Sequence, residues 1–572
     1  MLSDESNTMT LMSHANSRRT FWVVTFALGV IAVTGIHSGA TTRFELNDDW
    51  LIADILSGRF TGSCQAHVLY VHIWLARALA WLYCTIPSIE WYVVCLLFCH
   101  ALALAGFGLI VLDQNAPRLS MGLSFTVLTV VFIIPKVLVL TYTTAAAILA
   151  ASGMLLVLGG LQKPNTARGQ VTLGLCYLGV ATLVRPEAFA LILVLALPGL
   201  VQCAMKGRSA KTGTTLLLIL AIGGGFTWIH QYEYQSDASW SETLHYSRAR
   251  VAVHDSFAVK RRVETGGQLV ENTFSEVGWT QNDADLFFDW VYFDRALYSI
   301  ESLEIIRARL APSAPESTWN IEGWIKSAKQ GLWDLISLSQ ENGMLMQLFV
   351  CLALIVTSLR NRAATWWACV SALWVALVFV GIAIALKLPT RVVSPGLLYL
   401  TGSILVTGAP LAKFHSKALR HGTGIGLLAL LTIGLVDATL VERRNQHLAD
   451  EYYQVVSPLE SRKDLRVFVW PSAIPLEFAP VRANEDPRER AKIIRIGGWQ
   501  TGTPLQQKQF GALGVADPLR ALVDDNEAIL VSSPTQANLA LIYLSEHHGI
   551  WASAEEFLTT PRFSVFRLVT SR

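Results

Sequence analysis

About ten or eleven long apolar stretches between residues 21 and 440 constrain this sequence more than any other feature. Each approaches the roughly 20 residues that a helix needs to cross the hydrocarbon core of a bilayer. The composition agrees, because 52% of the residues are hydrophobic and only 15% are charged. The formal net charge of +2 argues against a nucleic-acid partner. The sequence therefore predicts a polytopic α-helical membrane protein embedded in a lipid bilayer.

The basic residues predict how the spans are oriented. Arg18 and Arg19 precede the first apolar stretch, which favours a cytoplasmic amino terminus. That stretch is longer than the core of a signal peptide and lacks a convincing cleavage site, so we expect a retained helix. Four further basic loops all become cytoplasmic if segment 67–86, which contains Arg77, lies along the outer face instead of crossing. They contain Lys163 and Arg168; Lys206, Arg208 and Lys211; Arg360 and Arg362; and Lys413, Lys417 and Arg420. The predicted spans are then near 21–39, 91–112, 120–135, 141–161, 171–184, 188–203, 212–229, 343–359, 364–386, 392–412 and 422–440.

This topology assigns the polar parts of the chain to the two faces. Residues 1–20 are a cytoplasmic tail, and residues 21–440 are the transmembrane domain. The first external loop, 41–90, and an external helical segment, 230–342, lie outside. The remaining residues, 441–572, are predicted as a small extracytoplasmic α/β domain.

Local patterns support both external regions. Helical periodicity in the external segment is clearest over 284–310. In the terminal region, strand-like runs at 466–470, 528–532 and 563–569 are combined with a helical pattern at 536–547.

The cysteines are predicted to be small buried hydrophobic residues. Seven of the eight fall in apolar segments, and their spacing is not that of metal ligands. The chain contains no cysteine over 230–342 or after 439, so a disulfide framework is not expected in the polar regions.

Two adjacent acids, Asp48 and Asp49, follow the first predicted span. Together with Asn47 they are typical of a helix start, where side-chain acceptors and acids stabilise free N–H groups. Alternatively, one aspartate is a general base for a hydroxyl nucleophile, and the pair could also hold a divalent cation such as Mg²⁺ or Mn²⁺. Both interpretations are compatible with each other.

Cationic residues are predicted at the same outer boundary. In Arg185-Pro186-Glu187 the proline favours a helix start. Arg185 and Glu187 either form an ion pair within a turn, or Arg185 binds a phosphate while Glu187 keeps the arginine oriented. Lys387 and Arg391 lie between two strong spans, where such residues commonly extend to the interface. Both nevertheless lie on the outer face in this topology, although basic residues are usually enriched on the cytoplasmic face. A lipid-linked phosphate in the outer leaflet would account for them.

Aromatic and polar residues of the external regions are candidates for binding a sugar acceptor. We single out His67, Trp279 and Asp283, because aromatic faces stack on sugars and polar side chains bind hydroxyl groups. The alternative is that aromatics at helical spacing pack a helical cap against the membrane.

Several of these motifs resemble the GT-C superfamily of integral-membrane glycosyltransferases, and in particular uncharacterised bacterial membrane proteins of that build. The resemblance rests on about eleven spans with an acidic pair in the first external loop, and on short motifs. These are Asn47-Asp-Asp49, Ser57-Gly-Arg-Phe-Thr-Gly62, His67, Ile89-Glu-Trp-Tyr92 and Gly278-Trp-Thr-Gln-Asn-Asp283.

The resemblance implies a glycosyltransferase in the bacterial plasma membrane that moves a sugar from a polyprenyl-phosphate donor to an external glycan, lipid or protein. It implies inversion at the anomeric carbon and an aspartate base, for which Asp49 is favoured with Asp48 as its neighbour or cap. Arg185, Lys387 and Arg391 are the candidates for binding the donor phosphate. A secondary transporter, or a non-catalytic scaffold or polymerase partner for envelope glycans, remains the alternative.

Overall fold

The computed structural model describes most of the chain. The described residues are 23–112, 118–163, 168–311, 344–358, 362–385, 389–406, 417–460, 465–471, 473–489, 493–559 and 563–570. The predicted tail 1–20, Lys387 and residues 312–342 of the predicted external segment lie outside them.

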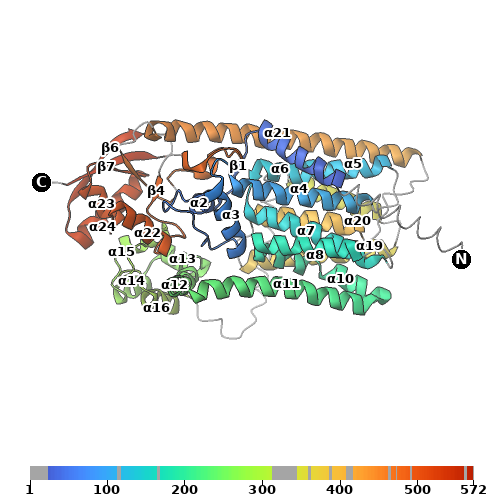
Figure 1. Ribbon diagram of the computed structural model, residues 1–572. Helices are drawn as coiled ribbons and strands as arrows, with labels where there is room; N and C mark the ends of the chain where they lie inside the picture. Colours follow the sequence, from blue (N-terminus) through green and yellow to red (C-terminus); the bar gives the residue numbers. More distant parts are fainter. Residues whose placement is uncertain are drawn as a thin grey trace.

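A bundle of apolar helices forms one end of the molecule (Figure 1). Four apolar helical stretches of the described residues are long enough to cross a bilayer: Trp91–Val111, Tyr142–Gln162, Leu197–Ser236 and Arg362–Ala383. The second of them, α7 (Tyr142–Gln162), is the centre of the bundle and is almost wholly buried against α4, α8, α9 and α20. The chain is therefore an integral membrane protein by the length and composition of its helices. The other labelled helices of the bundle are α4 (Trp91–Leu112), α5 (Arg118–Leu128), α6 (Ile134–Leu138), α8 (Arg168–Val184), α9 (Pro186–Leu195), α10 (Leu197–Cys203), α11 (Ser209–Ser236), α18 (Met344–Ser358), α19 (Arg362–Ala385), α20 (Thr390–Val406) and α21 (Lys417–Glu460).

Shorter apolar helices coincide with other predicted spans. They are Val23–Gly39, Ser124–Leu138, Pro186–Leu195, Met344–Val356 and Thr390–Val406. The count of eleven spans stays a prediction. Segment 67–86 contains the 13-residue helix α3 (Ile73–Thr85), which at about 1.5 Å per residue is shorter than the apolar core of a bilayer, and its position along the outer face stays a prediction. Trp74 and Trp81 on its surface are 45% and 65% exposed, as expected of a helix that lies at a membrane interface.

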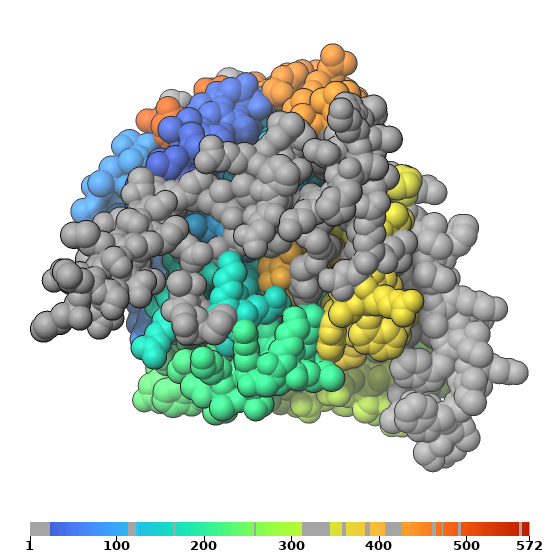
Figure 2. Space-filling model, turned by 90° about the vertical axis from the view of Figure 1, so that its right-hand side faces the viewer, coloured from blue at the N-terminus to red at the C-terminus, as the bar shows by residue number. Residues whose placement is uncertain are grey.

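Two long helices run past the predicted ends of their spans. We predicted span ends at 229 and 440, but α11 continues to Ser236 and α21 continues to Glu460. The side chains become more polar at residues 229 and 440, but no residue there ends a helix. A span boundary placed by hydropathy therefore falls inside a continuous helix. These helices form opposite edges of the molecule in Figure 1, and Figure 2 shows α21 with the first span on one side and α11 on the other.

The external segment folds into short helices at the end of the molecule away from the N-terminus (Figure 1). The continuous helical pattern predicted over 284–310 is wrong, because residues 289–299 separate α15 from α16. Trp290 lies at this break with φ 69°, a left-handed conformation that is unusual for a residue with a side chain. The helices are α12 (Ala238–His254), α13 (Phe257–Thr265), α14 (Gln268–Glu276), α15 (Gln281–Phe288) and α16 (Ile300–Leu310).

The residues after α21 form a five-stranded sheet in the order β4-β3-β5-β7-β6. Strands β4, β3 and β5 are parallel, whereas β7 is antiparallel to β5 and β6. The three predicted strands coincide with β3, β5 and β7, while β4 and β6 were not predicted. The elements are β3 (Arg466–Val469), β4 (Ile493–Arg495), α22 (Pro504–Leu513), α23 (Pro518–Asp524), β5 (Ala528–Ser532), α24 (Pro534–His548), β6 (Ala552–Thr559) and β7 (Ser564–Thr570).

A disulfide joins Cys64 to Cys84 and corrects the prediction for these two cysteines. The bond ties the loop before α3 to the end of α3, a pairing that a separation of 20 residues does not reveal. Four other cysteines fit the prediction better, since Cys99, Cys203 and Cys351 are buried and Cys95 is partly buried. Cys176 and Cys369 are exposed on apolar helices.

Candidate functional site

The acidic pair lies in the first turn of α2 (Asn47–Ser57), between the apolar bundle and the terminal sheet (Figure 1). The residue before the helix is Leu46, and no side chain caps the helix start. Asn47 is therefore not the N-cap that the sequence suggested. Both Asp48 and Asp49 still lie where the helix dipole favours negative charge.

Asp49 is fully buried and is bound by neighbouring helices. Its Oδ1 accepts hydrogen bonds from the hydroxyl of Tyr92 on α4, at 2.7 Å, and from the backbone N–H of Tyr142, at 3.0 Å. Tyr142 is the first residue of α7, so Asp49 satisfies a free N–H at the start of that helix. Burial raises the pKa of Asp49 to about 8, although these hydrogen bonds lower it.

Asp48 faces three arginines from three separate parts of the chain. They are Arg185 before α9, Arg391 in the first turn of α20 and Arg495 in β4. Burial raises the pKa of Asp48, and the three positive charges lower it to a smaller extent. The result is an acid with a raised pKa inside a cationic site.

Arg185 is held by two tyrosines and one acid. Its guanidinium carbon lies 5.1 Å from the ring centre of Tyr70 and 5.0 Å from that of Tyr142, and its Nε is 2.9 Å from Oε2 of Glu187. The ion pair predicted for the Arg185-Pro186-Glu187 motif is therefore present, while phosphate binding by Arg185 stays a prediction. Glu187 is 69% exposed while Arg185 is only 19% exposed, so the cation points inward from its partner.

The terminal sheet contributes Arg495 and Trp499 to the same site. Arg495 is buried over the ring of Trp50, at 5.2 Å, and burial lowers its pKa to about 10. The indole nitrogen of Trp499 is buried on the side of Asp48, and its N–H lowers the pKa of that acid. Trp499 also packs edge-on against Tyr70, with 5.3 Å between ring centres.

The loop that carries Trp499 is fixed by the external segment. The N–H of Gly498 donates to the carbonyl of Trp290, at 3.0 Å, and the hydroxyl of Tyr292 donates to the carbonyl of Gly498, at 2.8 Å. A side chain at Gly497 would place its Cβ 2.3 Å from the Trp290 carbonyl oxygen, so only glycine fits there. The unusual backbone of Trp290 thus belongs to the contact that positions Trp499.

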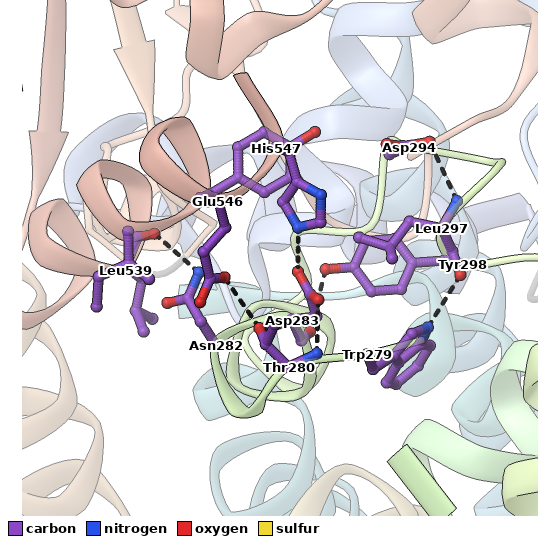
Figure 3. Close-up of polar contacts among 12 residues, drawn as sticks. Trp279, Thr280, Asn282, Asp283, Asp294, Leu297, Tyr298, Leu539, Glu546 and His547 are labelled. Carbon is purple, nitrogen blue, oxygen red and sulfur yellow. Dashed lines mark hydrogen bonds and ion pairs between the residues drawn. The ribbon is translucent and has the colours of Figure 1, made fainter. Parts of the chain in front are cut away.

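The three predicted acceptor residues lie in packed surroundings. His67 stacks on Trp240, with 5.0 Å between ring centres. Trp279 is 4% exposed, and its indole N–H donates to the carbonyl of Leu297. Asp283 is fully buried and binds His547 (Figure 3).

Four residues of the site were not predicted as site residues: Tyr70, Tyr142, Arg495 and Trp499. Arg495 stands in the run Ile493-Ile-Arg-Ile496, which looks like an ordinary strand. Its proximity to Asp48 depends on a contact across more than 440 positions, for which the sequence carries no local signal.

Together these features define a helical integral membrane protein with an acid and three arginines at the polar end of its bundle. No family model and no curated protein matches the sequence. Two solved structures of ArnT from Cupriavidus metallidurans align with most of the chain. The structure bound to undecaprenyl phosphate is 13% identical over 95% of this chain and 97% of that chain, with a TM-score of 0.36. The apo structure is 15% identical over 96% and 98%, with a TM-score of 0.38. At TM-scores below 0.5 the likeness decides neither the family nor the function of this chain.

Proposed function

We propose that this protein is a GT-C-type membrane glycosyltransferase that moves a sugar from a polyprenyl-phosphate donor to a hydroxyl of a glycan, lipid or protein acceptor. The observation that carries the proposal is the position of Asp48 among Arg185, Arg391 and Arg495 at the polar end of an apolar bundle. A lipid phosphate needs cations beside an apolar path, and a hydroxyl nucleophile needs a base. This site combines the two requirements.

Asp48 is proposed as the general base. A sugar hydroxyl is a weak nucleophile until its proton is withdrawn in the transition state. Asp48 takes this proton as the acceptor oxygen bonds to the anomeric carbon and the bond from that carbon to the phosphate oxygen breaks. Asp48 is partly exposed whereas Asp49 is fully buried, so an incoming hydroxyl can reach Asp48. Attack opposite the leaving phosphate inverts the anomeric carbon.

The arginines are proposed to bind the donor phosphate. The phosphodiester of the donor carries one negative charge, and the departing polyprenyl phosphate gains another. Guanidinium groups bind phosphate oxygens through paired N–H donors, and they do so most strongly where water is excluded. Three such groups supply the positive charge that a divalent cation would otherwise provide, so we propose transfer without an obligatory Mg²⁺ or Mn²⁺.

Asp49 is proposed as the residue that holds α2 in place. The sequence favoured it as the base, but its Oδ1 is occupied by Tyr92 and Tyr142, and its pKa of about 8 keeps it largely protonated at neutral pH. Asp49 is fully buried, so an incoming hydroxyl cannot reach it unless α2 and α7 rearrange. Asp48 is therefore the better candidate.

The disulfide supports an extracytoplasmic position for the site. Disulfides persist in oxidising compartments and are rare in the cytosol. The Cys64–Cys84 bond lies in the loop and helix that follow α2.

Radiolabelled polyprenyl-phosphate sugars, incubated with the purified protein and a panel of envelope acceptors, test the proposed reaction. We expect the wild-type protein to release polyprenyl phosphate and form labelled product, and Asp48→Asn to do neither. Equal donor consumption by the wild type and Asp48→Asn would contradict the role of Asp48. Counterflow of a labelled solute without sugar transfer would instead favour a transporter.

A further inference from the structure

A histidine and two carboxylates from distant parts of the chain meet where α15 contacts α24 (Figure 3). They are Asp283 of α15 and Glu546 and His547 of α24. One ligand atom from each residue lies within 4.8 Å of the other two. Nitrogen and carboxylate oxygen at such separations are the donor types that bind zinc and similar ions.

The cluster is fixed from both sides. Asp283 is the third residue of α15 and forms a capping box with Thr280, in which its Oδ2 accepts the backbone N–H of Thr280 at 2.8 Å. Its Oδ1 is 2.8 Å from Nε2 of His547. The Thr280 hydroxyl also donates to Oε2 of Glu546, at 3.0 Å. The orientation of Asp283 is therefore set before any ion binds.

An unpaired oxygen provides a second indication of a ligand. Asn282, the neighbour of Asp283 in α15, is only 5% exposed. Its amide nitrogen donates to the carbonyl of Leu539 on α24, at 3.2 Å, which turns the side chain toward that helix (Figure 3). Its Oδ1 is buried and has no hydrogen-bond partner among the described residues. A buried carbonyl oxygen without a donor is unfavourable unless a water or a cation satisfies it.

We propose that this cluster binds a divalent transition-metal ion such as Zn²⁺. The ligands are Nε2 of His547 and one oxygen each of Asp283 and Glu546, with a water in the fourth position. The ion replaces the proton that His547 shares with Asp283, and this proton leaves to solvent. The two carboxylates balance the charge of the ion. Histidine disfavours Mg²⁺ and Ca²⁺, which prefer sites made wholly of oxygen.

A metal here would link the external segment to the terminal sheet. The same contact includes Asp289, which accepts hydrogen bonds from Trp470 and Gln536. The external segment also binds the loop that carries Trp499, through Trp290 and Tyr292. Bound metal should therefore stabilise the arrangement that brings the terminal sheet to Asp48, without touching the reacting groups.

Zn²⁺ binding to the full-length protein tests the proposal, with the protein purified without a polyhistidine tag and stripped with a chelator. We expect calorimetric titration to give one ion per chain, and Co²⁺ to give visible absorption of a nitrogen and oxygen site. Glu546→Gln and His547→Ala should each weaken binding at least about 10-fold, because each removes one of three protein ligands. Glu546 is exposed, so its variant should fold.

His548→Ala is the matched control, because His548 is the adjacent histidine and pairs instead with Asp517, at 2.8 Å. We expect this variant to bind Zn²⁺ as the wild type does, and Zn²⁺ to raise the melting temperature of both. The proposal is overturned if the wild type binds no Zn²⁺ at 100-fold excess over protein. It is equally overturned if Glu546→Gln and His547→Ala bind the ion as tightly as His548→Ala.

Discussion

Asp48 and Asp283 each stand in the first turn of a short helix among aromatic residues, yet their surroundings differ in one respect. Both oxygens of Asp283 are bound within the protein, by Thr280 and His547. Asp48 instead interacts with three arginines and with the indole of Trp499. Three cations around one carboxyl leave a surplus of positive charge, which is unfavourable in the free protein and is typical of sites that bind an anion. Residue type alone did not distinguish the two acids, but the groups around them do, because Asp283 is paired within the protein whereas Asp48 lies among cations.

The largest expected effect separates these two acids directly. Asp48→Asn removes the proposed base while keeping the size of the side chain, so we expect the rate of sugar transfer to fall by about 10²–10⁴-fold. Asp283→Asn changes the contact between α15 and α24, which contains none of the proposed reacting groups. With both proteins stripped of metal, its rate should stay within about 3-fold of the wild type once the folded fraction is matched. Single-turnover measurements with a radiolabelled donor give both rates. Comparable losses in the two variants would remove the distinction.

The arginines provide the next test. Arg495→Gln should lower kcat/KM by about 10–100-fold, because a charge-assisted contact to phosphate contributes about 1.5–3 kcal/mol. Arg466→Gln is the matched control, since Arg466 is also at a strand of the terminal sheet but pairs with Asp525 and is 42% exposed. The comparison requires donor titrations for both variants. If Arg466→Gln lost as much as Arg495→Gln, the effect would belong to the sheet and not to phosphate binding.

The sequence predicted the elements that depend on local pattern. The span 91–112 coincides with α4 because a long apolar run is sufficient to define a membrane helix. Strands β3, β5 and β7 were predicted from β-branched and aromatic runs, whereas β6 was missed because its Ala-Ser-Ala-Glu-Glu start carries no such pattern.

The candidate site was only half predictable. Asp48, Arg185 and Arg391 could be named because charges at the ends of apolar spans are conspicuous. Arg495 and Trp499 could not, since they approach Asp48 only after the terminal sheet packs against α2. The choice between Asp48 and Asp49 also required the structure, because adjacent residues of a helix point in different directions.

The proposed structural role of Asp49, as opposed to the catalytic role of Asp48, is tested by measuring stability. Asp49→Ala leaves the Tyr142 N–H and the Tyr92 hydroxyl without an acceptor, so we expect a loss of about 2–4 kcal/mol, whereas Asp49→Asn keeps the acceptor and should lose less. Burial raises the pKa of Asp49 to about 8 in the folded protein, so the folded state holds a proton that the unfolded state releases near its ordinary pKa. Stability should therefore fall as the pH rises toward 8, by at most about 1.4 kcal/mol per pH unit from this group.

Melting curves in detergent from pH 5 to pH 8 measure this dependence. The Asp49→Asn variant lacks the titrating group and should show a flatter profile than the wild type. Identical slopes would mean that Asp49 is not the source of the pH dependence, and would reopen its role as an ionised base.

The smallest expected effect on activity concerns the disulfide beside the Asp48 region, which has no counterpart near Asp283. In a variant that retains only Cys64 and Cys84, we expect no labelling of intact cells by a membrane-impermeant maleimide before reduction and two labels per chain afterwards. Replacing Cys64 and Cys84 by serine in this two-cysteine variant gives a protein without cysteine, which should stay unlabelled. It should keep its activity within about 2-fold, because the bond restrains α3 without contacting Asp48. Labelling of the two-cysteine variant before reduction would mean that the thiols are free. Labelling only after the membrane is permeabilised would place this loop in the cytoplasm, and would move the proposed site away from an outer-leaflet donor.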